Sequence, residues 1–178
     1  MKVTNYSPSR FLVPLAAAFL LTSATVIAGS SLGRDDTDFV EKAAKGNLAE
    51  VEMGRLAVQK AASPELKAFG NRMIRDHSKA NRELSALAAS KGVDVPKSAS
   101  LSEDVSYAHL KMLSGKSFDD AYIKMMVDDH KEDVSAFQKA ADYSQDPAVK
   151  HFASKTLPTL QSHLTKIEQI QSDFGGTK

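Results

Sequence analysis

Two stretches of the sequence place a methionine four residues before a histidine. Residues 73–81 read MIRDHSKAN and residues 126–134 read MVDDHKEDV, so each has Met, a β-branched residue, one variable position and then Asp-His. Residues four apart lie on the same face of a helix. Imidazole nitrogen and thioether sulfur together are ligands that suit copper. The two stretches therefore allow a transition-metal site, and they equally allow core packing, in which methionine is a common filler.

Residues further along each stretch indicate that the histidines face the core. His77 and His130 each lie seven residues before a large apolar residue, and His163 has one apolar residue three before it and another four after it. These offsets predict that three helices each direct one histidine inward. His109 and His151 lack such neighbours and are expected at the surface or in a connection.

The aspartates that precede two of these histidines are predicted to act elsewhere. Adjacent residues lie about 100° apart around a helix, so neither Asp76 nor Asp129 can face the histidine that follows it. Asp76 is expected to meet Arg72 or Lys79 on the surface of its own helix. Alternatively, Asp76 or Asp129 orients the histidine of a neighbouring helix, which would lower the cost of burying an imidazole.

Two interpretations of the inward-facing residues stand ahead of any other. The leading one is a binding or structural module whose core holds a polar network of Glu50, Asp76, His77, Asp129, His130 and His163. The alternative is a copper-type metal site made by His77, His130 and His163, with Met73 and Met126 as further candidate ligands. Glu50 is included because its neighbours four residues away on either side are glycines, so it borders a close-packed face.

A di-iron oxidase is a third interpretation, and the sequence argues against it. Di-iron sites in helical bundles place a glutamate three residues before a histidine on each of two helices. The residues three before the five histidines are Ile74, Ser106, Val127, Ala148 and Leu160. The chain also has no cysteine, no G-x-S-x-G nucleophile elbow and no phosphate-binding glycine loop. No catalytic residue is therefore assigned, an enzyme is not favoured, and no cofactor is required, although copper or another transition metal is compatible with the chain.

Helical periodicity and capping signals predict an all-α chain without strands. The predicted helices run over 38–62, where Asp38 and Glu41 have capping-box spacing, over 64–91, from the cap at Ser117, and from Asp146 onward. The connection over 93–117 is expected to hold one short helix. Pro158 is expected to kink or unwind the last helix. Two helical hairpins joined by a long crossover make a four-helix bundle, predicted over 38–173.

The N-terminal residues indicate export. Lys2 and Arg10 precede an apolar run over 11–21, and Val26 and Ala28 fit the −3 and −1 positions of a signal-peptidase site. We therefore expect a signal peptide over 1–28, cleaved after Ala28, a flexible tether over 29–37, and a periplasmic or secreted protein. The alternative is a retained N-terminal membrane anchor, and contact with a membrane is expected only in that case.

The charge of the chain excludes one class of partner. The formal net charge is +1, and without Lys2 and Arg10 it becomes −1. Basic residues alternate with acidic ones along the chain, so nucleic-acid binding is not expected. The sequence indicates neither a protein partner nor an oligomeric state.

Three segments of the chain resemble one bacterial family. They read GNLAEVEMGRLAVQKAASPELKAFGNRMIRDHSKANRELSALAASKGVDVP, SFDDAYIKMMVDDHKEDVSAF and LPTLQSHL. They resemble the bacterial domain of unknown function 4142 over about residues 38–170. The resemblance implies an exported or membrane-associated protein with a ferritin-like four-helix fold. It implies no activity, because fold-level likeness does not assign chemistry.

The resemblance also singles out particular residues. The family's recurrent Asp-His elements match Asp76-His77 and Asp129-His130, and its Leu-Pro-x-Leu-x-x-His element matches residues 157–163. Its first-helix pattern falls on Glu50 and Glu52. Many relatives carry a lipoprotein cysteine after the signal segment. This chain has none, so attachment through such a lipid is excluded.

Overall fold

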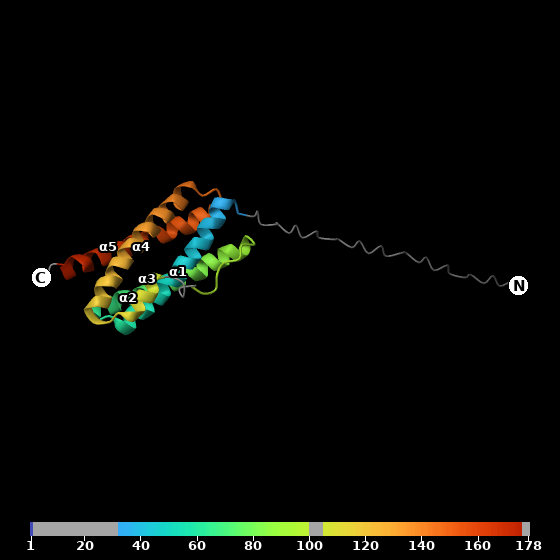
Figure 1. Ribbon diagram of the computed structural model, residues 1–178. Helices are drawn as coiled ribbons and strands as arrows, with labels where there is room; N and C mark the ends of the chain where they lie inside the picture. The colour runs from blue at the N-terminus through green and yellow to red at the C-terminus, as the bar shows by residue number, and fades with distance from the viewer. Residues whose placement is uncertain (2–31, 100–104, 176–178) are drawn as a thin grey trace.

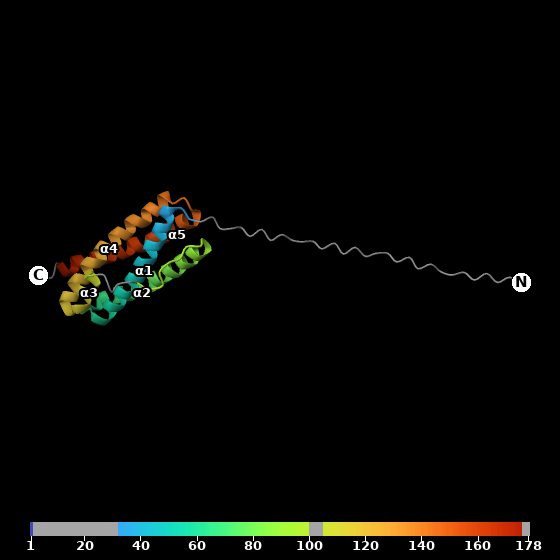
Figure 2. The same cartoon turned by 45° about the vertical axis from the view of Figure 1, so that its right-hand side comes forward.

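The chain folds as a helical bundle made of two hairpins. The computed structural model describes Met1 and residues 32–99 and 105–175, and no strand occurs among them. The helices are α1 (Arg34–Lys60), α2 (Pro64–Ser90), α3 (Val105–Met112), α4 (Gly115–Tyr143) and α5 (Pro147–Gly175). Figures 1 and 2 show α1 beside α2 and α4 beside α5, with the short α3 in the crossover. The predicted all-α, ferritin-like bundle of two hairpins is confirmed.

The turn and end of the first hairpin follow the predicted capping. Ser63 precedes α2, and its hydroxyl accepts hydrogen bonds from the first free backbone N–H groups of that helix. Pro64 is the first helical residue, where the missing N–H of proline has no consequence. Beyond α2, Gly92 has a φ of +69°, a left-handed conformation that glycine adopts without a steric penalty.

Two helices begin earlier than predicted. Residues 34–37, expected in the tether, form the first turn of α1, and the capping box predicted at Asp38 lies inside that helix. Asp35 and Asp36 favour this start because negative side chains interact well with a helix N-terminus. On the other side of the molecule, α4 begins at Gly115 rather than after Ser117.

Pro158 was predicted to kink or unwind the last helix, and it does not unwind α5. The helix continues without a break from Pro147 to Gly175. Pro158 and Ser154, whose carbonyl would have received the missing N–H, are both exposed, so water can hydrogen-bond to that carbonyl group.

The hairpins are tied together at both ends by buried aspartates. Asp119 of α4 accepts hydrogen bonds from the backbone N–H groups of Ala62 and Ser63, each at 3.0 Å, in the turn between α1 and α2. At the opposite end, Asp36 of α1 accepts one from the backbone N–H of Asp146, also at 3.0 Å. These contacts fix the position of one hairpin against the other.

The core consists of two apolar clusters. One contains Met53, Leu56, Phe69, Met73, Phe118, Tyr122, Met126, Ile167 and Ile170, among others. The second contains Val40, Ala44, Leu84, Phe137, Val149, Phe152, Leu157 and Leu160, among others. On α2 and α4, the histidines lie between a methionine of the first cluster and a large apolar residue of the second. A polar layer therefore separates the two halves of the core.

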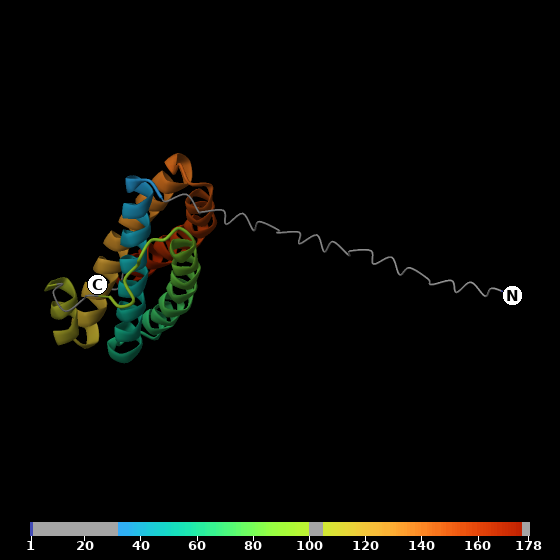
Figure 3. The same ribbon diagram turned by 90° about the vertical axis from the view of Figure 1, so that its right-hand side faces the viewer.

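A pair of glycines brings α1 and α2 into backbone contact. A Cβ atom added to Gly54 would lie 2.7 Å from the carbonyl oxygen of Gly70, and one added to Gly70 would lie 2.6 Å from the carbonyl oxygen of Gly54. No side chain fits at such a separation. The two helices can approach this closely only because both positions are glycine. Figure 3 shows the two helices side by side along their length.

The predicted signal peptide, its cleavage after Ala28 and the alternative anchor fall on residues 2–31, which lie outside the described part of the chain. Within the described part, none of the helices combines the length and apolar character needed to cross a membrane.

Candidate metal centre

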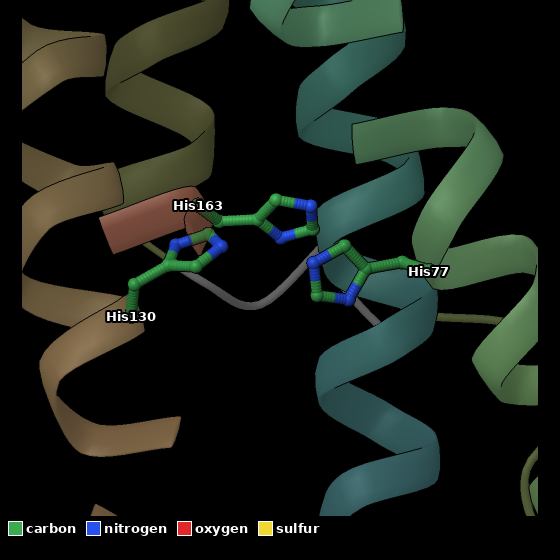
Figure 4. A group of neighbouring side chains, drawn as sticks. All are labelled: His77, His130 and His163. Carbon is green, nitrogen blue, oxygen red and sulfur yellow. The ribbon is translucent and has the colours of Figure 1, made fainter. Parts of the chain in front are cut away.

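Three helices bring one histidine each to the middle of the bundle. His77 comes from α2, His130 from α4 and His163 from α5, and their exposed fractions are 2%, 0% and 0%. The ring centroids are 5.3 to 5.7 Å apart. One nitrogen atom of each ring lies within 4.8 Å of the other two. Figure 4 shows the three rings around a common space, with one nitrogen of each turned toward it. His109 and His151 are exposed, as predicted.

In two of the rings, the hydrogen bond of one nitrogen identifies where the proton lies. His130 Nδ1 is 2.9 Å from the carbonyl oxygen of Met126, and His163 Nε2 is 2.9 Å from Asp76 Oδ2. A carbonyl or carboxylate oxygen only accepts hydrogen bonds, so each of these ring nitrogens must carry a hydrogen. In a neutral imidazole the other nitrogen then carries a lone pair. For His130 that atom is Nε2, and for His163 it is Nδ1.

The third ring is held by a residue of the remaining helix. His77 Nδ1 is 3.0 Å from Oδ1 of Asn47 on α1. With the amide oxygen in this position, Nδ1 donates the hydrogen bond and Nε2 carries the lone pair. All four long helices therefore contribute to the arrangement: three supply histidines, and α1 supplies an orienting amide.

The three lone-pair nitrogens have no partner. His77 Nε2, His130 Nε2 and His163 Nδ1 are buried and make no hydrogen bond with any described residue. They cannot bond to one another because none of them carries a hydrogen. Buried polar atoms in proteins are nearly always satisfied. In each ring, one nitrogen donates a hydrogen bond outward and the other, unpartnered nitrogen converges with those of the other two rings. Histidine ligands of metal ions have this arrangement.

Burial also keeps the rings uncharged. Burial lowers the pKa of His77 well below its ordinary value, and the neighbouring His130 and His163 lower it further. The pKa of His130 falls to about 4, mainly through burial. Burial likewise lowers the pKa of His163, although the hydrogen bond to Asp76 opposes this shift. The lone pairs are therefore available at neutral pH without loss of a proton.

Asp76 fulfils both of the roles considered for it from the sequence. Its carboxylate is 3.4 Å from Arg72 on its own helix, and it also accepts the hydrogen bond of His163 on α5. Burial raises the pKa of Asp76, but the hydrogen bond from His163 and the charge of Arg75 outweigh it and lower the pKa. An ionised carboxylate behind a ligand imidazole fixes its orientation and increases its basicity.

Glu50 approaches the centre from α1. Its side chain is 4% exposed, and its Oε1 lies 3.7 Å from His130 Nδ1. Its Oε2 has no hydrogen-bond partner among the described residues. Burial, together with the negative charges of Asp133 and Asp129, raises the pKa of Glu50 well above its ordinary value.

The remaining predicted residues surround this group without entering it directly. Asp129 is half-buried on α4, where its charge acts on Glu50. Met73 and Met126 are fully buried in the first apolar cluster, one turn before His77 and His130. Met126 contributes its backbone carbonyl group to the centre.

Sequence reasoning missed Asn47. Its position in the sequence could have identified it as a buried polar residue. Asn47 lies between Ala44 and Val51 on the buried face of α1, three residues before Glu50. Its exposed fraction is 5%. Among the described residues, the three histidines are the one group of three or more potential metal-binding histidines and carboxylates close enough to share an ion, and this group contains no carboxylate. The ligand pattern of a di-iron bundle is therefore not found in it.

Comparison with known proteins identifies the family. The family described as "Domain of unknown function (DUF4142)" matches residues 22–170. The chain belongs to this family. A comparison with curated protein sequences found no match.

Several solved structures share the fold of this DUF4142 chain. A DUF305 fragment from Deinococcus radiodurans is 12% identical, covers 80% of this chain and 99% of its own, and has a TM-score of 0.71. A DUF305 protein from Streptomyces coelicolor is 13% identical over 79% of this chain and 92% of its own, with a TM-score of 0.69. CopM in its Cu(I)-bound form is 21% identical over 79% of this chain and 98% of its own, with a TM-score of 0.67. At these identities the likeness establishes the shared fold.

Proposed function

We propose that this protein binds one transition-metal ion, copper in preference to others, through His77 Nε2, His130 Nε2 and His163 Nδ1. The convergence of three buried nitrogens that lack any other partner carries this proposal. A purely structural histidine network would use both nitrogens of each ring in hydrogen bonds. Here the outward nitrogens make the hydrogen bonds to protein groups, and the inward ones make none with any described residue.

The chemistry of the donor set favours copper in its monovalent state. The ligands are three neutral imidazoles buried between two apolar clusters, and the cost of burying an ion rises with its charge. Calcium and magnesium prefer oxygen ligands. Zinc takes four ligands, and a zinc site with three histidines needs a water molecule to complete its tetrahedron, whereas this buried centre offers three imidazoles. Imidazole and thioether groups suit copper, and Met73 and Met126 lie one turn from two of the histidines.

The structural neighbours support the same choice of metal. CopM, which shares this fold, is known in Cu(I)-bound, Cu(II)-bound and Ag-bound forms. The N-terminal signal pattern supports a site of action outside the cytoplasm. A mature protein that begins at Gly29 is the expected result of mass spectrometry, and an intact Met1 would contradict cleavage.

Metal analysis and titration of protein purified without a histidine tag test the proposal. We expect one Cu(I) or Ag(I) ion per chain in the wild type and none in His77→Ala or His130→Ala. His109→Ala and His151→Ala are matched controls, because both residues are histidines at the exposed surface. A wild-type protein that binds no stoichiometric metal would refute the proposal, as would full binding by the His77→Ala and His130→Ala variants.

A further inference from the structure

An acidic groove opens at one end of the seam between α1 and α4. The groove is a cavity of about 330 Å³ with a floor of Phe39, Ala43, Phe137 and Ala140. Its charged lining consists of four carboxylates and two ammonium groups, which belong to Asp35, Asp36, Asp38, Asp133, Lys42 and Lys139. Phe39 and Phe137 pack edge to face, with ring centroids 5.0 Å apart, and close the groove toward the apolar core.

Asp133 connects this groove with the histidine centre. It lines the groove and lies three residues after His130 on α4, which corresponds to about 4.5 Å along the helix axis. Residues three apart share a helix face, so Asp133 and His130 lie on the same side of α4. The facing position on α1 is Gly46, where an added Cβ would lie 3.9 Å from Asp133 Oδ1. The seam is therefore lined here by a carboxylate and by a residue without a side chain.

Glu50 continues the path by one turn. It lies four residues after Gly46 on α1, and its Oε1 is 3.7 Å from His130 Nδ1. Its Oε2 is buried and has no hydrogen-bond partner among the described residues. An unsatisfied carboxylate oxygen is costly in a protein interior. From the groove toward the centre, the carboxyl groups of Asp133 and Glu50 thus follow one another and end beside the Nδ1 edge of His130, the ring whose Nε2 is a proposed ligand.

A second cavity near the centre has the opposite character. It measures about 190 Å³ and reaches Asp76, the residue behind His163. Its charged lining comprises three cationic groups and two carboxylates, from Arg72, Lys79, Lys155, Asp76 and Glu83. A positive ion is repelled on that side and attracted on the side of the acidic groove.

The geometry points to a specific access route: monovalent copper or silver ions reach the three histidines along the α1–α4 seam, through the acidic groove and past Asp133 and Glu50. This inference rests on the proposed function. Oxygen atoms at successive turns replace part of the water that a cation loses as it leaves the surface. Gly46 has no side chain that would fill the seam opposite Asp133.

Rates of Ag(I) uptake test the route. Purified protein is mixed with radioactive Ag(I) in a quench-flow instrument, unbound ion is removed by excess chelator, and the bound ion is counted. Uptake is measured at pH 8, where Asp133 is ionised because burial raises its pKa only to about 7. Asp133→Asn then removes a negative charge at the inner end of the groove, and Gly46→Leu fills the seam opposite Asp133. We expect Asp133→Asn to slow uptake about 3- to 10-fold through weakened electrostatic steering, and Gly46→Leu to slow uptake because the added side chain obstructs the seam. In Gly46→Leu, release should slow by the same factor as uptake, because an obstruction raises the barrier in both directions and leaves the affinity unchanged.

Two matched variants control for general effects. Gly46→Ala adds a Cβ at ordinary contact distance, and Glu83→Gln removes a carboxylate from the other cavity. Both should take up Ag(I) at the wild-type rate. Wild-type uptake rates in both Asp133→Asn and Gly46→Leu would overturn the route, as would weaker binding caused only by faster release. If the wild type itself takes up no Ag(I), the proposed function fails, which is a distinguishable result.

Discussion

The hydrogen bond between Asp76 and His163 offers a sharp test of the metal centre. Asp76 Oδ2 accepts it from His163 Nε2 at 2.9 Å, which leaves Nδ1 of the ring free for an ion. Asp76→Asn keeps the size of the side chain and removes its negative charge. The amide holds the ring less firmly and makes the imidazole a weaker electron donor, so the metal–nitrogen bond should weaken.

The expected loss can be stated in advance. Removing such a partner lowers metal affinity by about 10- to 100-fold, which corresponds to about 1.4 to 2.8 kcal/mol of binding free energy. The metal-free protein should lose about 1 to 2 kcal/mol of its free energy of unfolding, which is at the lower end of the range that hydrogen bonds to charged groups contribute to stability. The lower end applies because the Asp76 side chain is 20% exposed and water replaces part of the interaction.

Competition with a Cu(I) chelator of known affinity measures the first effect, and urea unfolding of the metal-free protein measures the second. Glu83→Gln is the control. Glu83 accepts a hydrogen bond from Lys155 at 2.9 Å, so it also links α2 to α5, two turns beyond Asp76, but it touches no histidine. Wild-type Cu(I) affinity in Asp76→Asn would refute the reasoning, and so would an equal loss of affinity in Glu83→Gln.

The helix contact, the buried acids and the metal itself each lead to a further prediction. Gly54→Ala should lower the free energy of unfolding by about 1 to 3 kcal/mol, because its Cβ would lie 2.7 Å from the carbonyl oxygen of Gly70. Gly46→Ala should be neutral or stabilising by up to about 1 kcal/mol, and equal urea midpoints for these two variants would contradict the contact. Burial and neighbouring negative charges raise the pKa of Asp133 to about 7. The wild type should therefore lose free energy of unfolding as the pH rises from about 4 to about 7, because Asp133 ionises more readily in the unfolded chain. Asp133→Asn has no such group, so its stability relative to the wild type should increase over the same range. The gain at pH 8 should reach up to about 4 kcal/mol, and a wild-type–variant difference in urea unfolding that is the same at pH 4 and pH 8 would argue against it. Free Cu(I) at about 100 times its dissociation constant should raise the free energy of unfolding by about 2.7 kcal/mol, and an unchanged urea midpoint would count against binding to the folded state.

The sequence was sufficient to predict the fold and the meeting of the three histidines. Helical offsets determine which face of a helix a residue occupies, and His77, His130 and His163 each share a face with large apolar residues. In a four-helix bundle all such faces meet at one axis. Their convergence therefore follows from local pattern and bundle topology alone.

The hydrogen bonds that orient the rings could not be predicted in the same way. They cross between helices, so they depend on how far each helix is shifted along its neighbour, and sequence spacing does not specify this shift. The two Asp-His pairs illustrate it: they match in sequence, yet Asp76 reaches a histidine on α5, whereas Asp129 acts on Glu50 of α1. The early start of α1 was missed because the stabilising contact of Asp36 comes from Asp146, a residue distant in the sequence.

The glycine contact between α1 and α2 has a consequence for the metal centre. Gly54 and Gly70 meet backbone to backbone. Asn47 lies seven residues before Gly54, and His77 lies seven residues after Gly70. In antiparallel helices, equal steps from a fixed point arrive at the same level, about 10 Å away in this case. The glycines thus set the register that brings Asn47 Oδ1 within 3.0 Å of His77 Nδ1. Two residues without side chains thereby determine which nitrogen of a distant histidine faces the other two histidines.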